Sequence, residues 1–437
     1  MNKRKYRWLV VVIFFIFMLL HQTDKLLINP MAGMIISEWG LTDTQWGAIA
    51  TVALIVGAVL YPVWGYLYDK YARNKLLALA SFIWGATTWL SAIAPTYHLF
   101  VATRASTGID DSSYPGLYSL IADYFSPGVR GKIYGLLQIA MPLGYLVGLV
   151  LAMTVATSIG WRNMFLFTGG MGILLSIVIF FCIREVPRGE SEPELTELSE
   201  IGIYRFEWSK VRDIFKKPSL ILMYVQGFFG VFPWNTITAF IFLYLAEERG
   251  VYEHHILITM VPTILVLSFG YPLGGILGDF FFKKSPRGRV LVAMSGVLIG
   301  AVLLYIAMGV PNNQLTTFSL MFILTALFIP IASPNVTSTI NDVALPEIRS
   351  TALSIQYFIE SSGAALAPFI TGVISDSLRA SNNLSPRGNA ILIISVSSWI
   401  LCGIFFFMAS RVIPKDIKDL RSEMHRRAKK EKSKVEI

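Results

Sequence analysis

The chain has 437 residues, of which 54% are hydrophobic and only 15% are charged. Soluble domains usually carry about 25% charged residues, so this composition excludes an ordinary soluble protein. Apolar stretches of about 20 residues recur from end to end, and a helix of that length crosses a bilayer. The period-two alternation typical of a transmembrane β-barrel is absent. We therefore expect an all-α membrane protein with many transmembrane helices.

Twelve apolar segments are long enough to be transmembrane helices. We expect these helices at residues 8–35, 45–68, 76–94, 98–124, 131–157, 162–183, 219–246, 254–280, 289–309, 315–341, 351–376 and 388–410. The longest polar stretch separates the first six from the last six. The expected domains are an N-terminal bundle (1–184), a cytoplasmic central loop (185–218), a C-terminal bundle (219–411) and a basic cytoplasmic tail (412–437).

The basic residues are distributed unevenly across the expected membrane. With twelve spans, 31 of the 37 Lys and Arg residues fall on the side of the membrane that holds both termini and the central loop. Cytoplasmic loops are enriched in Lys and Arg, so we expect an integral protein of the cell membrane with both termini in the cytoplasm. The net charge of +9 then reflects topology rather than nucleic-acid binding. We expect the tail to be solvated and to contact anionic lipid headgroups.

Two sequence patterns occur once in each half of the chain. Residues 123–131 (DYFSPGVRG) and 342–350 (DVALPEIRS) share the pattern D-x-x-x-P-x-x-R-[GS], at an offset of 219 residues. Residues 65–69 (GYLYD) and 275–279 (GILGD) share G-x-L-x-D, at an offset of 210 residues. These matched pairs indicate duplicated halves. Transporters built from such repeats place their substrate near the midplane, between the repeats.

The segment GYLYDKYARNK (65–75) resembles the loop between helices 2 and 3 of the major facilitator superfamily, and the resemblance extends over the whole chain. Within that superfamily, TDK (23–25) and RASTGIDDSSY (104–114) are similar to motifs of the spinster-like lipid transporters. The chain departs from these motifs where lysine replaces arginine at Lys25 and where aspartates replace glycine and glutamate at Asp110 and Asp111. The resemblance implies the major facilitator fold, two pseudo-symmetric six-helix bundles, in a monomer without a cofactor.

Charged residues inside the expected spans are the main functional candidates. Such residues are costly in a bilayer, so they normally face a cavity and pair with one another. Arg104 and Asp111 are seven residues apart and share a helix face, whereas Asp110 points elsewhere, either toward the first helix or into a water pocket. In the first helix, Asp24 lies three residues after His21, on one polar face. The resemblance implies that the first and fourth helices line a central cavity, in which Asp24 and Arg104 meet.

These residues suggest a proton-coupled mechanism. Asp24 and Asp111 would share Arg104, and a proton on either carboxylate would free the guanidinium. Arg104, helped by Lys25, would then bind an anionic group of the substrate, because its fork can bind carboxylate or phosphate in a bidentate way. The alternative is a structural salt bridge that only orients the two helices. Lys25 and His21 could also lie at the extracellular mouth without contacting substrate.

Fewer charged residues occur in the expected spans of the second half. Glu360 could be a second proton site, or it could cap a polar pocket near the cytoplasmic side. Trp234 could stack on a ligand or could serve packing alone. Further substrate-binding candidates are His21, Tyr114, Tyr118, Trp234, Asn235, Asn335 and Gln356.

Charged residues at the ends of the expected helices form a separate group. The resemblance implies that they act as cytoplasmic latches, which stabilise the outward-facing state. The alternative is that each residue only complements the dipole of its own helix. The group comprises Asp69, Arg73, Asp123, Arg130, Asp279, Asp342 and Arg349.

The sequence favours a carrier over other functional classes. It contains no GxxxxGK, HExxH or GxSxG motif, and its two cysteines lie in apolar stretches without a metal-binding pattern, so neither an enzyme nor a metal site is expected. We expect a secondary transporter whose partners are protons, membrane lipids and a small amphiphilic or anionic substrate, such as a lysolipid. The alternatives are a carrier of an organic anion, sugar or drug-like solute, and then a channel or a transporter-like sensor.

Overall fold

The computed structural model describes residues 3–28, 31–41, 43–193 and 208–435. Within these ranges the chain is almost entirely helical, and no β-strand occurs. The first half comprises α1 (Lys3–Leu27), α2 (Ala32–Trp39), α3 (Asp43–Lys70), α4 (Arg73–Ala92), α5 (Tyr97–Asp111), α6 (Tyr114–Tyr124), α7 (Pro127–Gln138), α8 (Ala140–Leu151), the π-helix η1 (Ala152–Ala156), α9 (Thr157–Ile159) and α10 (Trp161–Cys182).

The second half follows a linker that contains the short helix α11 (Trp208–Ile214). It comprises α12 (Pro218–Gly230), α13 (Phe232–Leu243), the π-helix η3 (Tyr244–Glu248), α14 (Glu253–Lys284), α15 (Gly288–Met308), α16 (Leu315–Phe328), the 3-10 helix η4 (Ile329–Ile331), α17 (Ala332–Val343), the 3-10 helix η5 (Pro346–Ile348), α18 (Arg349–Ala380) and α19 (Pro386–Val435).

Each of the twelve predicted spans corresponds to one helix or to a run of consecutive helices. Eight helical segments of the described residues are long and apolar enough to cross a membrane. The other four predicted spans lie in the first half and correspond to α3, α4, α5–α6 and α7–η1. The prediction of an all-α membrane protein is confirmed, although α1 ends at Leu27, well before the predicted boundary at residue 35.

Several spans are interrupted within their length. The helix predicted at 98–124 is broken after Asp111 and resumes as α6 at Tyr114, with Pro115 in its first turn. Proline is tolerated in the first turn of a helix because the N–H that it lacks has no intrahelical acceptor there. This break turns the start of α6 toward α1, and the candidate functional site lies beside it.

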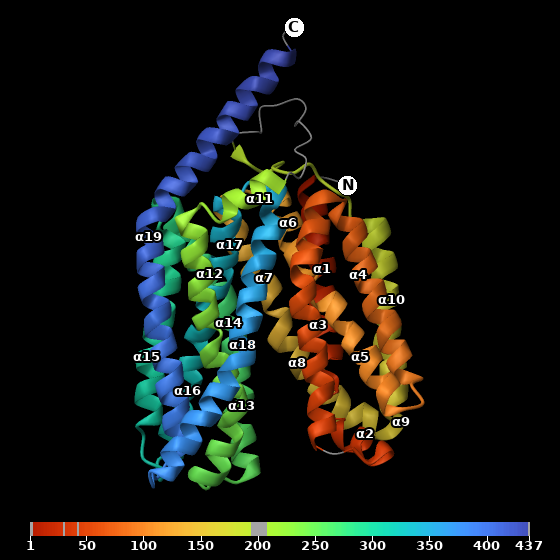
Figure 1. Cartoon of the computed structure of the whole chain (residues 1–437), viewed down its shortest axis with the longest axis vertical. Helices are drawn as coiled ribbons and strands as arrows, with labels where there is room; N and C mark the ends of the chain where they lie inside the picture. Colours follow the sequence, from red (N-terminus) through yellow and green to blue (C-terminus); the bar gives the residue numbers. More distant parts are fainter. Residues whose placement is uncertain (1–2, 29–30, 42, 194–207, 436–437) are drawn as a thin grey trace.

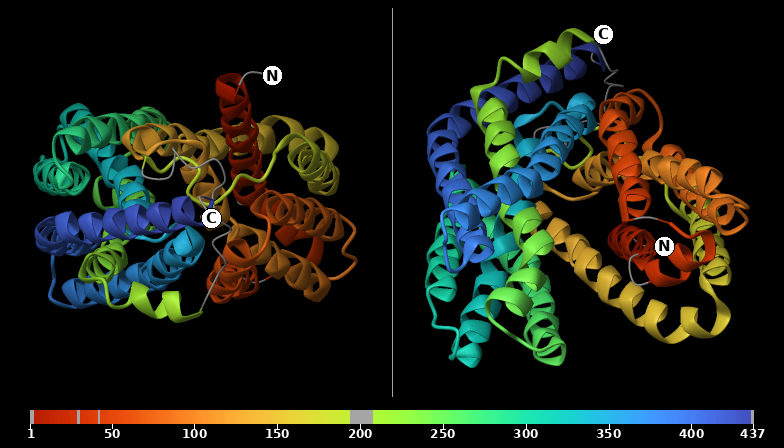
Figure 2. Two further views of the ribbon diagram at one scale, coloured as in Figure 1. Left: turned by 90° about the horizontal axis from the view of Figure 1, so that it is seen from above. Right: turned by 60° about the horizontal axis from the view of Figure 1, so that its bottom comes forward.

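The helices form two bundles that lie side by side (Figures 1 and 2). Helices α1–α10 make one bundle and α12–α19 the other, and the halves contact each other mainly through α3 with α18 and through α7 with α14 and α17. The start of α1, the α3–α4 turn, the linker and the end of α19 lie at one end of the molecule, here called the termini end. Toward the opposite end the ribbons of the halves diverge (Figure 1).

The last helix is longer than the predicted final span. Helix α19 continues without interruption from Pro386 to Val435, so residues 412–435 extend the bundle as helix (Figure 1). Leu420, Met424 and Ala428 are buried and pack with Leu345 of the α17–α18 turn. This part of the chain therefore differs from the solvated tail that was expected, because one face of it is apolar and covered.

Candidate functional site

Asp24 lies at the centre of a polar cluster inside the first bundle. Its carboxylate is 1% exposed and accepts hydrogen bonds from three side chains on α4 and α10. The donors are Trp84 Nε1 at 3.0 Å, Thr88 Oγ1 at 3.0 Å and Thr168 Oγ1 at 2.5 Å. Buried charged groups are normally satisfied in this way. The cluster therefore ties α1 to α4 and α10 through a single carboxylate.

Arg104 of α5 faces this carboxylate without a direct hydrogen bond. Its Nη1 lies 3.8 Å from Asp24 Oδ2, close enough for an ion pair but too long for a hydrogen bond. Its guanidinium lies over the ring of Phe165, 5.2 Å from the centroid. Nη1 is buried and makes no hydrogen bond to any residue that the structure describes. The structure thus brings Asp24 and Arg104 together and leaves an N–H donor of Arg104 available.

Asp110, which the sequence placed on a different face from Arg104, also meets α1. Its Oδ2 lies 2.5 Å from His21 Nε2, and Nδ1 of the same imidazole lies 2.7 Å from the hydroxyl of Tyr114. The predicted partner Asp111 ends α5, and its side chain lies outside the described part of the structure. The sharing of Arg104 between Asp24 and Asp111 therefore stays a prediction.

The other first-half candidates lie near this cluster. Lys25 follows Asp24 on α1 and is half-buried. Tyr118 is fully buried and packs edge-on against Tyr134, with ring centroids 5.2 Å apart. Their roles in substrate binding stay predictions.

The second bundle contains a cavity of about 210 Å³. Four of the predicted residues line it, namely Trp234 and Asn235 of α13 and Gln356 and Glu360 of α18. Gln356 donates a hydrogen bond of 2.7 Å to Glu360. The rest of the lining is mainly apolar and aromatic, and the polar Gln226, which the sequence analysis did not assign to binding, also lines the cavity.

Asn335 does not line this cavity. Its amide donates hydrogen bonds of 2.9 and 2.8 Å to the backbone carbonyls of Gly274 and Ile331. The side chain is buried where α17 crosses α14, so in this structure it fastens these helices together.

The two D-x-x-x-P-x-x-R-[GS] segments pair reciprocally across the halves. Arg349 of the second half lies 3.1 Å from Asp123 of the first, and Arg130 of the first lies 3.1 Å from Asp342 of the second. All four side chains are buried. The aspartate and arginine of each repeat therefore exchange partners with those of the other repeat at the termini end.

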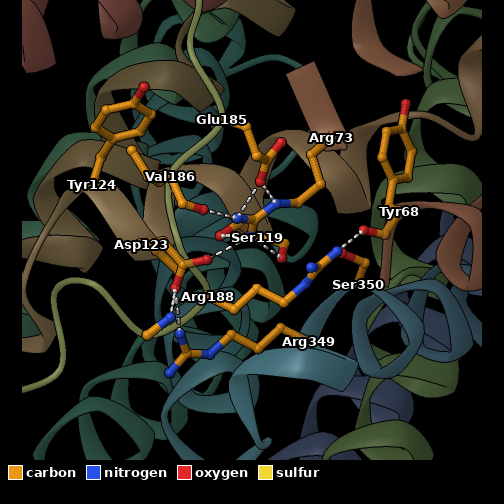
Figure 3. Close-up of polar contacts among 12 residues, drawn as sticks. Tyr68, Arg73, Ser119, Asp123, Tyr124, Glu185, Val186, Arg188, Arg349 and Ser350 are labelled. Carbon is orange, nitrogen blue, oxygen red and sulfur yellow. Dashed lines mark hydrogen bonds and ion pairs between the residues drawn. The ribbon is translucent and has the colours of Figure 1, made fainter. Parts of the chain in front are cut away.

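Each of these aspartates also binds an arginine of its own half. Arg73 lies 2.5 Å from Asp123, and Arg289 pairs with Asp342. Figure 3 shows Asp123 between the guanidinium groups of Arg73 and Arg349. The predicted group of charged residues thus forms one network with two-fold pseudo-symmetry.

The aspartates of the two G-x-L-x-D segments accept backbone hydrogen bonds from helices of the opposite half. Asp69 accepts hydrogen bonds from the backbone N–H groups of Ser350 and Thr351, at 3.0 and 2.7 Å. Asp279 accepts from those of Gly131 and Lys132, at 3.1 and 2.9 Å. A carboxylate at a helix N-terminus is stabilised by unpaired N–H groups and by the helix dipole.

The linker completes the network, which the sequence analysis did not foresee. Glu185 lies 2.6 Å from Arg73, and Glu192 bridges Arg130, at 2.7 Å, and Arg349. Burial alone would raise the pKa of Glu192, but the two guanidinium groups lower it to about 2. The run of charged residues in 184–192 was a signal, but nothing in the sequence showed which groups they would reach.

Two helical halves that contain buried, opposite charges define a membrane carrier rather than a soluble enzyme. The chain belongs to the Major Facilitator Superfamily, whose family pattern matches residues 13–368. The interpretation as a transporter, not an enzyme, is thereby confirmed.

The chain is similar to spinster proteins and to a bacterial efflux pump. It is 27% identical to protein spinster homolog 1 of Xenopus tropicalis, over 85% of this chain and 73% of that protein. It is 23% identical to an MFS-type efflux pump of Mycolicibacterium smegmatis, over 94% of each chain. Its fold matches the crystal structure of a bacterial homologue of the human lysosomal transporter Spinster, in an inward-facing and unoccupied conformation. That match has a TM-score of 0.62 at 20% identity and covers 94% of this chain and 98% of the other.

Proposed function

We propose that the chain is a proton-coupled secondary transporter of a small amphiphilic or anionic substrate, with a lysolipid favoured, and that it works by alternating access. The observation that carries this proposal is the buried ion pair of Asp24 and Arg104, 3.8 Å apart, in which the guanidinium keeps a donor without a hydrogen bond. A purely structural ion pair would be expected to satisfy its buried donors.

Protonation of Asp24 would change both sides of this pair. Oδ2 of Asp24 accepts from Trp84 and Thr88, and Oδ1 accepts from Thr168 alone, so a proton can add at the remaining lone pair of Oδ1. The same proton removes the negative charge in front of Arg104, whose guanidinium can then bind a carboxylate or phosphate of the substrate. The Asp24 carboxylate and the substrate anion would thus compete for Arg104, and a proton on Asp24 would favour the substrate, with Lys25 adding positive charge.

The cavity of the second bundle would take the apolar part of the substrate. Its wall is mainly apolar, with the polar residues Gln226, Asn235, Ser333, Thr337 and Gln356 and the carboxylate of Glu360 among the exceptions. Such a lining suits an amphiphile. The resemblance of TDK and RASTGIDDSSY to motifs of the spinster-like lipid transporters also favours a lipid-like substrate.

The charge network would hold the termini end closed in one of the two transport states. Because most basic residues lie on that side, we place it in the cytoplasm of a cell-membrane protein, and the state is then outward-facing. Transport would require the cross-half pairs of Asp123 and Asp342 to separate.

The similarity to the MFS-type efflux pump favours a second candidate, proton-driven export of a drug-like solute. The two functions differ in substrate rather than in mechanism. Thermal-shift measurements with lysophospholipids, short organic acids and hydrophobic drugs on the purified protein would distinguish them.

The proposal is tested by Asp24→Asn in proteoliposomes, with uptake of labelled lysophospholipid as the readout. The variant should lose uptake driven by a pH gradient but keep counterflow, because exchange needs no net proton movement. Asp376→Asn, at an exposed carboxylate of α18, is the matched control and should retain both activities. If gradient-driven uptake survives in Asp24→Asn, the role of Asp24 is refuted, and if wild-type flux does not saturate, a channel is indicated.

A further inference from the structure

His21, Asp110 and Tyr114 form a second buried polar group beside the Asp24 site. Nε2 of His21 lies 2.5 Å from Asp110 Oδ2, and Nδ1 lies 2.7 Å from the hydroxyl of Tyr114. The three residues are 3%, 0% and 4% exposed and come from α1, α5 and α6. Both ring nitrogens are therefore engaged, one by an acid and one by a hydroxyl that can either donate or accept.

This arrangement defines how the group would hold a proton. With one proton on the imidazole, Nε2–H donates to Asp110, and Tyr114 donates its O–H to Nδ1. With a second proton, Nδ1 becomes a donor as well, so Tyr114 must accept and its own O–H must turn away. Gain of a proton at His21 would therefore reverse the hydrogen bond to the first residue of α6, at the break between α5 and α6.

The ring of His21 is also in contact with the Asp24 site. Phe17 stacks on the imidazole with ring centroids 5.8 Å apart, and Trp84 meets it edge-on at 5.4 Å. Trp84 is the residue whose Nε1 donates to Asp24. A change at His21 can thus reach Asp24 through one shared tryptophan.

Several titratable or charged side chains surround the pair of His21 and Asp110. They are Asp24 and Lys25 on α1, Tyr68 on α3, Arg104 on α5 and Tyr114 on α6. Arg104 is directed at Asp24, whereas the carboxylate nearest His21 is that of Asp110.

We propose that His21 and Asp110 form a second proton-binding site, distinct from Asp24, in which Tyr114 reads the protonation state and transmits it to the start of α6. This inference rests on the proposed proton-coupled function. It gives Asp110, as the partner of His21, a part in proton binding, whereas the sequence analysis had Asp111 share Arg104 with Asp24, and it makes His21 and Tyr114 members of a proton site rather than substrate ligands.

The direct test is the protonation state of His21 in the full-length protein, measured by NMR in detergent micelles. The chain has five histidines, so selective ¹³C and ¹⁵N labelling gives few signals, and His21→Gln identifies the one to follow. The ¹⁵N shifts should report an Nε2–H tautomer. As the pH falls from about 9 to about 5, the signal should pass to that of the doubly protonated form. Asp110→Asn should move the pH of this transition by about one unit or more.

Two results would overturn the proposal. One is a His21 transition at the same pH in wild type and Asp110→Asn. The other, which needs no variant, is a wild-type signal that shows the Nδ1–H tautomer at every pH. His98, which is not part of this cluster, serves as an internal control and should titrate identically in both proteins.

Transport assays separate this inference from the function on which it rests. His21→Gln should keep counterflow but lose most of the pH dependence of gradient-driven uptake, and Tyr114→Phe should show the same pattern. If wild type is proton-driven and His21→Gln retains the full pH dependence, the second site fails while the proposed function stands. If wild type shows no proton-driven uptake, the proposed function fails, whatever the NMR shows.

Discussion

Among single residues, Glu192 of the linker contacts both halves. Its carboxylate lies between Arg130 and Arg349, which occupy equivalent positions of the two repeats. One linker residue thus neutralises part of the positive charge that two symmetric arginines bring together. Removal of one member of such a buried pair leaves the other charge uncompensated.

This contact predicts a pH-dependent contribution to stability. The pKa of Glu192 falls from an ordinary 4.5 to about 2 on folding, so its contribution is complete above pH 4.5 and is lost as the pH falls toward 2. Glu192→Gln should lower the free energy of unfolding by about 3 kcal/mol at neutral pH. Thermal melts in detergent at pH 7 and at successively lower pH, down to the lowest that the wild type tolerates, measure the difference.

The difference in Tm between wild type and Glu192→Gln should shrink as the pH falls below 4.5. Glu190→Gln, two residues earlier in the linker, serves as the control and should melt close to wild type at every pH. A difference between Glu192→Gln and wild type that stays constant with pH would contradict the ionic origin of the effect.

The charged residues of the first bundle were only partly predictable from sequence. Charge within an apolar span, together with the resemblance, placed Asp24 near Arg104, and the structure brings them together. Helical spacing grouped Asp111 with Arg104, yet Asp110 is the residue that reaches His21. A long arginine side chain can reach α1 from a different helix face than a short aspartate can. Assigning residues to helix faces therefore could not predict which acid contacts which residue of α1.

Among helices, the contact of α4 with α10 depends on a pair of glycines. A Cβ on Gly85 would lie 2.5 Å from the carbonyl oxygen of Gly169 and 2.7 Å from the backbone nitrogen of Ile173. Backbone atoms cannot give way as a flexible side chain can. Trp84 and Thr88, on the same helix, donate to Asp24, so the close packing also sets the geometry of the site.

We therefore predict that Gly85→Ala destabilises the protein by about 1–3 kcal/mol, because the added methyl group overpacks a closed interface. The matched control is Gly170→Ala on α10, where the nearest atom to the new Cβ is a flexible Trp89 atom at 3.7 Å. That change should be neutral or slightly stabilising. Thermal melts of both variants decide the matter, and equal melting temperatures would refute the packing argument.

The number and order of the helices were predictable, but their ends and breaks were not. The length of the apolar segments was enough to predict the spans, because the thickness of the bilayer sets the length that a transmembrane helix needs. The interruption between α5 and α6 depends on Pro115 and on local packing, and the apolar run continues across it. The final helix had a readable signal, because Leu420, Met424 and Ala428 recur at four-residue spacing within a basic sequence.

At the scale of the whole molecule, reciprocal hydrogen bonds and ion pairs join the two repeats. Asp69 accepts from backbone N–H groups in the first turn of α18, and Asp279 accepts from those in the second turn of α7; the two aspartates are 210 residues apart, the offset of the G-x-L-x-D segments. Sequence comparison of the halves predicted the duplication, and the seven-residue spacing of aspartate and arginine in both D-x-x-x-P-x-x-R-[GS] segments agrees with the reciprocal pairing. The linker contacts had no counterpart in either repeat, so the duplication could not reveal them.

These contacts predict that Asp69→Asn and Asp279→Asn act in the same direction, although Asp279 also pairs with Arg289 at 2.6 Å. Each change weakens a cross-half cap worth about 0.5–2 kcal/mol, so each should shift the equilibrium toward opening of the termini end, by roughly tenfold at the upper part of that range. Spin labels at Tyr71 and Lys284, on the two halves at that end, should show a larger fraction of long distances in both variants.

Asp376→Asn in the same labelled background should leave the distance distribution unchanged. An effect of Asp69→Asn without a comparable effect of Asp279→Asn would show that only one of the two caps controls the conformation.

The 50-residue helix α19 is about 75 Å long at an ordinary helical rise, whereas a bilayer core is about 30 Å thick. Arg427 binds Glu347 at 3.0 Å, which fixes the protruding portion to the second bundle. If the second bundle rotates during transport, the end of this portion should therefore be displaced more than the residues inside the bundle. A dye on the exposed Lys429 would then be displaced farther than a dye inside the membrane, so that its movement could report single transport cycles.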